Sequence, residues 1–391
     1  MADETTTAST ETVDASSAEA SSETNGTAST HTPWTRQSID IPAEPIQETL
    51  SYDTYPADAF EHDALGFSDD DVLDILRTML LQRRFEMRCR QMYQQQYISG
   101  FLHLYIGQEA VSIGSVKAIR LGEDSVITAY RDHGLGLAMG MDPKACMAEL
   151  FGKKTGVSKG KGGSMHFFDA EKKMMGGHGI VGAHIPLASG LAFAHKYKGE
   201  DNVCLCFFGD GAMAQGAYRE ALNLAGIYDL PVVFICENNQ YAMGTAVDRV
   251  QAQPDLFKHG YSFDMPCSLA SGMDVFSVNK AVSDHAALAR DGQPSMLEIR
   301  TYRYQGHSIS DPAKYRKEGE LDERRGEDAI DRLEKYVVAH DIATEDDIEA
   351  IDDEVQQIVL DAIQFAKDSD LPDESALYDD VYAQKDYNFL A

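Results

Sequence analysis

Two fully apolar segments with a helical stretch between them constrain the fold of this chain more than any other feature. Residues 203–208 and 232–236 are unbroken apolar runs, which is typical of strands buried on both faces of a sheet. We expect a helix over about residues 217–228. A strand–helix–strand unit of this kind normally places two parallel strands in one sheet, joined by a right-handed crossover. The sequence therefore predicts an α/β fold with a mostly parallel sheet flanked by helices.

Polar motifs follow both apolar segments, where the strands should end. The first segment runs into Gly209-Asp210-Gly211, and the second into Glu237-Asn238-Asn239-Gln240-Tyr241. Because ligands of open parallel sheets bind beyond the carboxyl ends of the strands, we expect Asp210 and Asn239 to reach the same edge. One carboxylate and one amide oxygen suit Mg²⁺, which keeps other positions open for phosphate oxygens and water. Taken alone, the Gly-Asp-Gly motif could equally end a strand in a tight turn.

The chain is strongly acidic, but its charge is unevenly distributed. It has 64 acidic and 34 basic side chains, a formal net charge of −30. Residues 1–30 hold six acids and no base, and residues 318–391 hold 24 acids and six bases, so residues 31–317 carry a net charge of only −6. A nucleic-acid-binding face is therefore not expected, whereas the nearly neutral middle could hold an anionic ligand. The acidic ends are expected to be solvated surface, with adaptation to high salt as a second interpretation.

The ends of the chain also suggest its domain organisation and location. Residues 1–30 contain fourteen Ser or Thr residues and cannot bury an apolar surface. We expect a disordered acidic tail over residues 1–45, one domain over 46–375 and a C-terminal extension over 376–391. The tail lacks the apolar stretch of a secretory signal and is too acidic for a mitochondrial presequence, so a cytoplasmic location is expected. No apolar run approaches the ~20 residues of a membrane helix, and no membrane association is expected.

Helices are expected near both ends of the large domain. Ser68 is a suitable N-cap for a helix that begins with three Asp residues. Two acidic helices are expected over about 328–340 and 344–367, and the second carries an apolar stripe that must pack on another element. The stripe consists of Ile348, Ile351, Val355, Ile358, Val359 and Ala362. Six widely spaced or apolar-flanked cysteines indicate a reduced protein with neither a disulfide framework nor a zinc site.

The spacing of the two strand-end motifs carries further information. A Gly-Asp-Gly sequence that is followed, after 26 residues, by Asn-Asn resembles the diphosphate-binding motif of thiamin-diphosphate enzymes. Other motifs resemble, in order, those of the alpha subunit of two-component 2-oxo acid dehydrogenases over about residues 65–375. They are Tyr130-Arg131-Asp132-His133-Gly134, Gly160-Lys161-Gly162-Gly163-Ser164-Met165-His166, Gly179-Ile180-Val181-Gly182 and Gly306-His307-Ser308. Segments 101–104 and 107–110 resemble the pyruvate type rather than the branched-chain type.

The resemblance implies a thiamin-diphosphate-binding fold with extra C-terminal helices, and it implies thiamin diphosphate and Mg²⁺ as cofactors. By match to the motif, Mg²⁺ would be held by Asp210, Asn239 and the backbone carbonyl of Tyr241. The residues that match diphosphate contacts are Tyr130, Arg131, Gly211 and Ala212. The guanidinium of Arg131 suits this role because it is permanently charged and fork-shaped. The two backbone amides are expected at the start of the following helix, where the helix dipole favours anions.

The resemblance also assigns the reacting end of the site. Gly179 and Val181 match positions that contact the aminopyrimidine ring. His103 and His307 match active-site histidines that orient substrate and cofactor or donate protons, and His307 also matches a cofactor contact. Histidine suits proton transfer because its ordinary pKa lies near working pH.

Four positions near these motifs remain open. His133 and His178 could belong to the site or could be structural. Many relatives have Gln at the position of His184 and Asn at the position of Ala214, so the local packing at both positions is uncertain.

The function implied is decarboxylation of pyruvate and reductive acetyl transfer to lipoamide on a dihydrolipoyl acyltransferase. The thiazolium ring of the cofactor acts as the electron sink. No motif in the chain supplies the Glu that activates the pyrimidine ring. The resemblance therefore implies half of an active site, completed by a beta subunit in a heterotetramer of two alpha and two beta chains.

Several alternatives remain. Alpha chains of acetoin dehydrogenase and of branched-chain 2-oxo acid dehydrogenase share the cofactor motifs. An inactive scaffold or docking subunit is a non-enzymatic alternative, although a full set of site residues argues against it. A dinucleotide-dependent dehydrogenase is disfavoured because no G-x-G-x-x-G motif lies between a strand and a helix.

Overall fold

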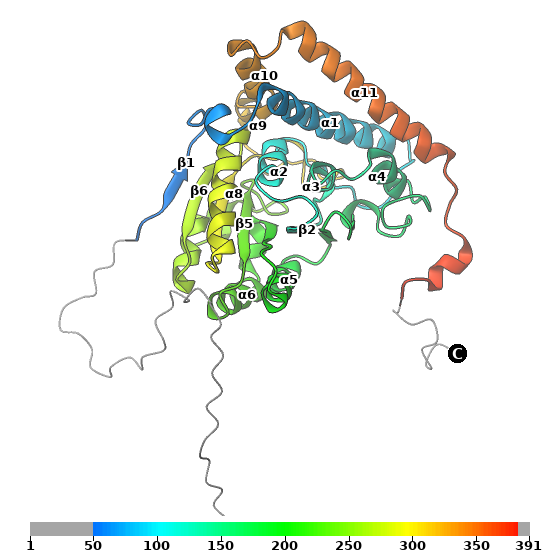
Figure 1. Ribbon diagram of the computed structural model, residues 1–391. Helices are drawn as coiled ribbons and strands as arrows, with labels where there is room; N and C mark the ends of the chain where they lie inside the picture. Colours follow the sequence, from blue (N-terminus) through cyan, green and yellow to red (C-terminus); the bar gives the residue numbers. More distant parts are fainter. Residues whose placement is uncertain (1–49, 382–391) are drawn as a thin grey trace, which may run out of the picture. The chain divides into compact units, whose positions relative to one another are not determined.

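Seven parallel strands form the sheet that supports the site. The computed structural model describes residues 50–381 of the chain. Within this part the strand order is β1-β6-β7-β5-β4-β2-β3, and every neighbouring pair is parallel (Figure 1). The strands are β1 (Asp53–Tyr55), β2 (Ser125–Ala129), β3 (Met174–His178), β4 (Cys204–Gly209), β5 (Val232–Asn238), β6 (Cys267–Ser271) and β7 (Ser295–Arg300). The predicted α/β fold with a mostly parallel sheet is confirmed.

The central strands β4 and β5 explain the two unbroken apolar runs. Leu205 and Phe207 of β4 belong to the hydrophobic core on one face of the sheet. Cys206 and Phe208, whose side chains point the opposite way, belong to the core on the other face. Strand β5 alternates in the same manner. Both faces of the strands therefore need apolar side chains.

Helices cover both faces of the sheet (Figure 1). Helices α5 and α6 pack together beside β4, whereas α8 packs on the other face and against α2. The helices are α1 (Asp69–Gln94), α2 (Glu109–Val116), α3 (His133–Ala138), α4 (Pro143–Leu150), α5 (His184–Lys198), α6 (Gly216–Ile227), α7 (Val247–Val250), α8 (Val275–Arg290), α9 (Glu320–Arg325), α10 (Ala329–Ala339) and α11 (Glu345–Asp368). Short 3₁₀ helices are η1 (Asp63–Leu65), η2 (Gly163–Met165), η3 (Asp210–Ala214), η4 (Leu256–Phe263) and η5 (Glu374–Tyr378).

The predicted terminal helices are present as α1, α10 and α11. Ser68 caps α1 as expected: its hydroxyl accepts a hydrogen bond from the Asp71 amide, and the Asp71 carboxylate accepts one from the Ser68 amide. Helix α11 runs alongside α1 and α4 (Figure 1). From its predicted stripe Val355, Val359 and Ala362 are fully buried, and the others are partly buried.

Some expectations concern residues beyond the described range. The disordered tail expected over 1–45 and most of the extension expected over 376–391 lie outside residues 50–381. No helix in the described range is long and apolar enough to cross a membrane. All six cysteines fall within it and are buried, free thiols.

Candidate active site

The two strand-end motifs lie at the same edge of the sheet. Asp210 directly follows β4, and Asn239 directly follows β5. The strands are hydrogen-bonded neighbours, with Gly209 opposite Glu237. Both polar side chains are almost completely buried. We call Asp210, Asn239 and Tyr241 the strand-end region.

The oxygens of this region converge on a positive charge. The Nη1 atom of Arg303 donates to Asn239 Oδ1 at 3.3 Å and to the Tyr241 carbonyl oxygen at 3.1 Å. The side-chain nitrogen of Asn239, Nδ2, donates to Gln108 Oε1 at 2.9 Å, which turns Asn239 Oδ1 away from Gln108. Two of the three oxygens expected to hold Mg²⁺ therefore already face one cationic group.

The third expected ligand is the carboxyl group of Asp210, whose ionisation is unfavourable when no cation is bound. Burial raises the pKa of Asp210 to about 6, although the nearby charge of Arg303 acts in the opposite direction. Residues 50–381 contain no cluster of three His, Cys, Asp or Glu side chains suited to a metal. The donor set that fits Mg²⁺ here is instead one carboxylate, one amide oxygen and one carbonyl oxygen.

Gly211 lets the two strand-end loops approach closely. A Cβ atom on Gly211 would lie 2.8 Å from the Cβ of Ala242. One detail of the prediction was wrong: Gly211 and Ala212 lie in the 3₁₀ helix η3, not at the start of the following α-helix. Gln215 is extended and separates η3 from α6, which begins at Gly216.

Two buried arginines give this edge a positive character. Arg131 donates to the Leu104 carbonyl at 2.6 Å and to the His307 carbonyl at 2.8 Å. Burial lowers the pKa of Arg131 to about 10, and the charge of Arg303 adds to this shift. Among the described ion pairs neither arginine has a carboxylate partner. Two guanidinium groups without carboxylates form a site prepared for an anion such as a diphosphate.

His103, His307 and Tyr130 lie together beside these arginines. The ring centroids of the two histidines are 5.3 Å apart, and the Tyr130 ring is 4.7 Å from His103. Burial, followed by the charge of Arg131, lowers the pKa of His103 to about 2 and that of His307 to about 4. Burial and positive neighbours therefore keep both imidazoles neutral, unlike an ordinary histidine near its unperturbed pKa. The Nδ1 atoms of both have no partner within the described residues.

The aminopyrimidine candidates lie at the surface. Gly179 and Val181 follow β3, and the side chain of Val181 is exposed next to the more exposed Ile180. A Cβ on Gly179 would approach the His166 ring at 3.5 Å, an ordinary contact. Val181 is therefore not a core residue of this chain.

The undecided histidines are held by structural contacts. His133 is fully buried behind His103, 3.1 Å from Glu86 and 3.0 Å from the hydroxyl of Ser164. His178 contacts the Met175 carbonyl at 3.1 Å, and its ring stacks on His184. His184 itself contacts the Phe207 carbonyl at 2.7 Å under β4.

The glycine-rich segment 152–163 folds around the buried carboxylate of Glu149. Its two oxygens accept hydrogen bonds from the amides of four residues at 2.7–3.0 Å: Ser158, Gly160, Gly162 and Gly163. The segment contains no α-helix or strand, and its last residue, Gly163, begins η2, which contains Ser164.

The functional candidates that the sequence did not reveal are Arg303, Gln108, Glu86 and Ser164. Gln108 and Ser164 lie within segments that carry the resemblance but received no role, and Glu86 and Arg303 lie outside them; all four meet the site through tertiary contacts. The segment from Thr301 to Gln305 carries no recognisable pattern other than its place before His307.

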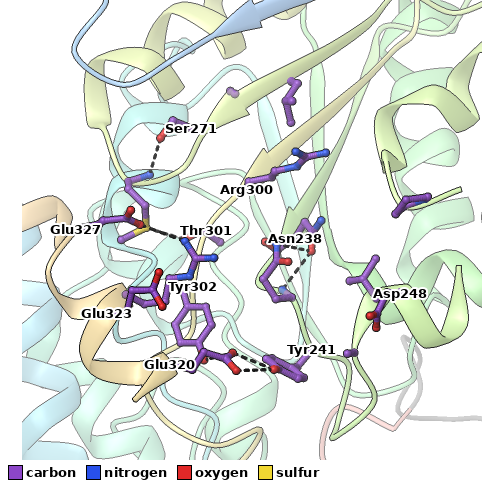
Figure 2. Close-up of a pocket in the computed structure, with 18 of the residues that line it drawn as sticks. Asn238, Tyr241, Asp248, Ser271, Arg300, Thr301, Tyr302, Glu320, Glu323 and Glu327 are labelled. Atoms are coloured by element: carbon purple, nitrogen blue, oxygen red, sulfur yellow. Dashed lines mark hydrogen bonds and ion pairs between the residues drawn. The ribbon is translucent and has the colours of Figure 1, made fainter. Parts of the chain in front are cut away.

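A cavity of about 950 Å³ is lined by Tyr241 and the residues that follow it (Figure 2). We call it the second cavity, because it is separate from the predicted site. Figure 2 shows the Glu320 carboxylate, which accepts hydrogen bonds from the hydroxyls of Tyr241 and Tyr302. Apart from Tyr241, the predicted site residues do not line this cavity. The carbonyl of Tyr241 thus faces Arg303 while its hydroxyl faces the second cavity.

Comparisons with known proteins agree with the geometry. The family model of the dehydrogenase E1 component matches residues 77–375. Similar proteins include the pyruvate dehydrogenase E1 component subunit alpha of Rhizobium meliloti, 50% identical over 317 residues, which covers 81% of this chain and 91% of the relative. The protein of the same name in Rickettsia bellii is 46% identical over 80% of this chain and 96% of the relative. The mitochondrial alpha-1 subunit of Arabidopsis thaliana is 45% identical over 81% of both chains.

Proposed function

The chain belongs to the dehydrogenase E1 component family, and we propose from this that it is the alpha subunit of a pyruvate dehydrogenase first component. It decarboxylates pyruvate and transfers the acetyl group reductively to lipoamide. The observation that carries the proposal is the convergence of Asp210, Asn239 and Tyr241 with two buried arginines at the ends of β4 and β5. Relatives named for pyruvate favour it over acetoin or branched-chain 2-oxo acids.

The strand-end region holds Mg²⁺ and, through it, the diphosphate of thiamin diphosphate. Asp210, Asn239 Oδ1 and the Tyr241 carbonyl supply the oxygens. Arg131 and the amides of Gly211 and Ala212 take up the charge of the diphosphate. When bound, thiamin diphosphate supplies the electron sink for decarboxylation.

The neutral imidazoles of His103 and His307 orient the substrate and exchange protons with it. Their Nδ1 atoms, which have no partner among the described residues, support this role, because each neutral imidazole can hydrogen-bond the substrate there without breaking an existing contact. Tyr130 packs against both rings and excludes water from between them.

A cavity lined by the chain segments that flank these histidines in sequence suits the acetyl acceptor. Its volume is about 770 Å³, and residues from the segments before His103 and around His307 line it. The lining from these segments consists of Ile98, Ser99, Gly100, Gln305, Ile309 and Asp311. The lipoyl arm of a dihydrolipoyl acyltransferase enters the site here.

A beta subunit completes the site over the exposed surface of α5 and α6. Large apolar side chains gather on and before these helices: Ile180, Val181, Leu187, Phe193, Tyr197, Leu224 and Ile227. An exposed apolar surface of this kind marks an interface. Because Val181 belongs to it, the partner reaches the aminopyrimidine position and contributes the missing Glu. The assembly is a heterotetramer of two alpha and two beta chains in the cytoplasm.

Reconstitution tests the function directly. The chain and its beta subunit are purified together, and release of labelled carbon dioxide from pyruvate is measured with thiamin diphosphate, Mg²⁺ and lipoamide. We expect turnover of pyruvate and no cleavage of acetoin. Cleavage of acetoin without decarboxylation of pyruvate would reassign the substrate, and binding of neither cofactor would leave only a scaffold.

A further inference from the structure

The segment that carries His103 is held by buried side chains rather than by a strand or helix. Residues 101–105 have no regular secondary structure. The His103 amide donates to Ser164 Oγ at 3.1 Å, and the Tyr105 amide donates to Glu86 Oε1 at 2.9 Å. Two amides that flank the His103 side chain are therefore fixed by Ser164 and Glu86.

His133 connects these two anchors. Its Nδ1 atom lies 3.1 Å from Glu86 Oε1, and its Nε2 atom lies 3.0 Å from Ser164 Oγ. The three residues come from α1, the first turn of α3 and η2, and all are at least 95% buried. Glu86, His133 and Ser164 thus form one continuous chain of hydrogen-bonding groups that begins and ends on the backbone of the His103 segment.

We propose that Glu86, His133 and Ser164 are positioning residues that set the place of the His103 imidazole for the reaction. The inference rests on the proposed function, in which His103 contacts the substrate. All three act through the His103 segment, because Ser164 and Glu86 accept hydrogen bonds from its backbone amides. An error of about 1 Å in the place of a catalytic group can cost about 100-fold in rate, which gives such a chain a measurable effect.

A purely structural role explains the arrangement less well. Apolar side chains of similar volume would fill the same space without the desolvation cost of a buried carboxylate and imidazole. Burial acts to lower the pKa of His133, but the carboxylates of Glu86 and Asp132 and the hydrogen bond to the Ser164 carbonyl together keep it above its ordinary value. The buried pair of Glu86 and His133 fixes the orientation of both side chains as well as the distance between them. Each end of the pair is hydrogen-bonded, directly or through Ser164, to the backbone of the His103 segment.

Ser164 is itself fixed by the glycine loop. The Glu149 carboxylate accepts the amides of Gly162 and Gly163, the two residues before Ser164. The hydroxyl of Ser164 therefore has a defined position before it meets the His103 amide.

A double-mutant cycle in the reconstituted holoenzyme tests the proposal. We expect Ser164→Ala to lower kcat about tenfold, with KM for pyruvate and the affinity for thiamin diphosphate unchanged within about twofold. In a His103→Ala background the same substitution should have no further effect, because its influence passes through His103. Independent, additive losses of kcat would overturn the proposal.

Two further variants separate positioning from folding. Ser164→Thr keeps the hydroxyl and should retain most of kcat, whereas His133→Gln breaks the link at Glu86 and should lower kcat as Ser164→Ala does. Ser115→Ala is the matched control, because this buried serine of α2 has a hydroxyl without a partner among the described residues. Wild-type kcat in His133→Gln would overturn the proposal.

Hydrogen exchange gives a readout that does not need turnover. Exchange of the amides in residues 101–106 is followed by mass spectrometry in the full chain. We expect the His103 amide to exchange about tenfold faster in Ser164→Ala, since it loses one buried hydrogen bond. Unchanged exchange of the His103 amide in Ser164→Ala would overturn the positioning proposal. If the exchange responds to the substitution but the wild-type holoenzyme does not turn over pyruvate, only the proposed function is overturned.

Discussion

Asp210 and Asn239 are positioned by a hydrogen-bonded sheet, whereas His103 and His307 are positioned by side chains that reach loop segments. In the strand-end region the place of each residue follows from the ladder between β4 and β5. In the loop region, which we define as residues 101–106 and 301–311, the backbone is held by the side chains of Ser164, Glu86, Arg131 and Arg316 and by scattered backbone hydrogen bonds. The first arrangement is a regular ladder, and the second is a set of separate contacts between segments.

This difference indicates separate tasks for the two regions. A sheet edge that cannot shift is suited to hold a charged cofactor in one place. Loop segments held by separate contacts outside a sheet can adjust around a substrate, because each contact contributes only about 1 kcal/mol. Changes in the strand-end region should therefore alter cofactor affinity, and changes in the loop region should alter turnover.

The largest effect is expected for Asp210→Asn. The substitution removes the only carboxylate among the three oxygen ligands. We expect the affinity for thiamin diphosphate in the presence of Mg²⁺ to fall about 1,000-fold, or about 4 kcal/mol, as when one partner of a buried charge pair is removed. Titration calorimetry of the reconstituted heterotetramer measures this.

Asp248→Asn is the matched control for this prediction. Asp248 is exposed and lines the second cavity rather than the site. Its variant should bind the cofactor as the wild type does. Equal affinities in wild type and Asp210→Asn would exclude Asp210 as a ligand of Mg²⁺. The assignment of cofactor binding to the strand-end region, as opposed to the loop region, would then lose its basis.

The next largest effect is expected in the loop region. His307→Asn removes an imidazole that exchanges protons with the substrate. We expect kcat to fall about 100-fold, the scale of one general acid or base, while cofactor affinity changes less than about threefold. His259→Asn, a half-buried histidine outside the site, should keep wild-type kcat. A loss of affinity as large as that of Asp210→Asn would show that the two regions do not have separate tasks.

The same difference explains what could be predicted from the sequence. The ends of β4 and β5 were predicted because the apolar runs fix the strands, and parallel strands bring their carboxyl ends to one edge. The capping of α1 by Ser68 was predicted because a cap needs only neighbours in the chain. The strand order was not predicted, because pairing of distant strands leaves no local signal.

The loop region could not be derived from residue pattern alone. His103 and His307 were found only by resemblance, and Arg303, Glu86 and Ser164 were missed. Their roles depend on contacts between segments that are distant in the chain, from 19 residues for Glu86 and Tyr105 to 64 residues for Arg303 and Asn239. The direction of the histidine pKa shifts was also missed, because burial and the neighbouring arginines are properties of the folded chain.

A smaller effect is expected from the packing of the strand-end loops. In Gly211→Ala the new methyl group would meet the Cβ of Ala242 at 2.8 Å, and neither loop can rotate it away. We expect a loss of about 2 kcal/mol in the free energy of unfolding, measured with urea. Gly216→Ala is the control, because nothing lies within 4 Å of its added Cβ at the start of α6. Equal stability of the two variants would mean that this edge is less rigid than the sheet geometry implies.

The smallest effect concerns the pH dependence at Asp132, a buried carboxyl at the start of α3 outside both regions. Burial raises the pKa of Asp132 to about 7, although the charge of the adjacent His133 acts in the opposite direction. Since the folded pKa exceeds the unfolded value, the stabilisation is complete at low pH and is lost as pH rises through 7. Between pH 6 and pH 8 the wild type should lose about 1.4 kcal/mol relative to Asp132→Asn, which keeps the acceptor for the Phe167 amide but does not titrate. Urea unfolding of both proteins at the two pH values measures the difference, with the exposed Asp341→Asn as the control. Parallel pH dependence of wild type and Asp132→Asn would mean that the Asp132 carboxyl does not change its protonation between pH 6 and pH 8, and would contradict the prediction.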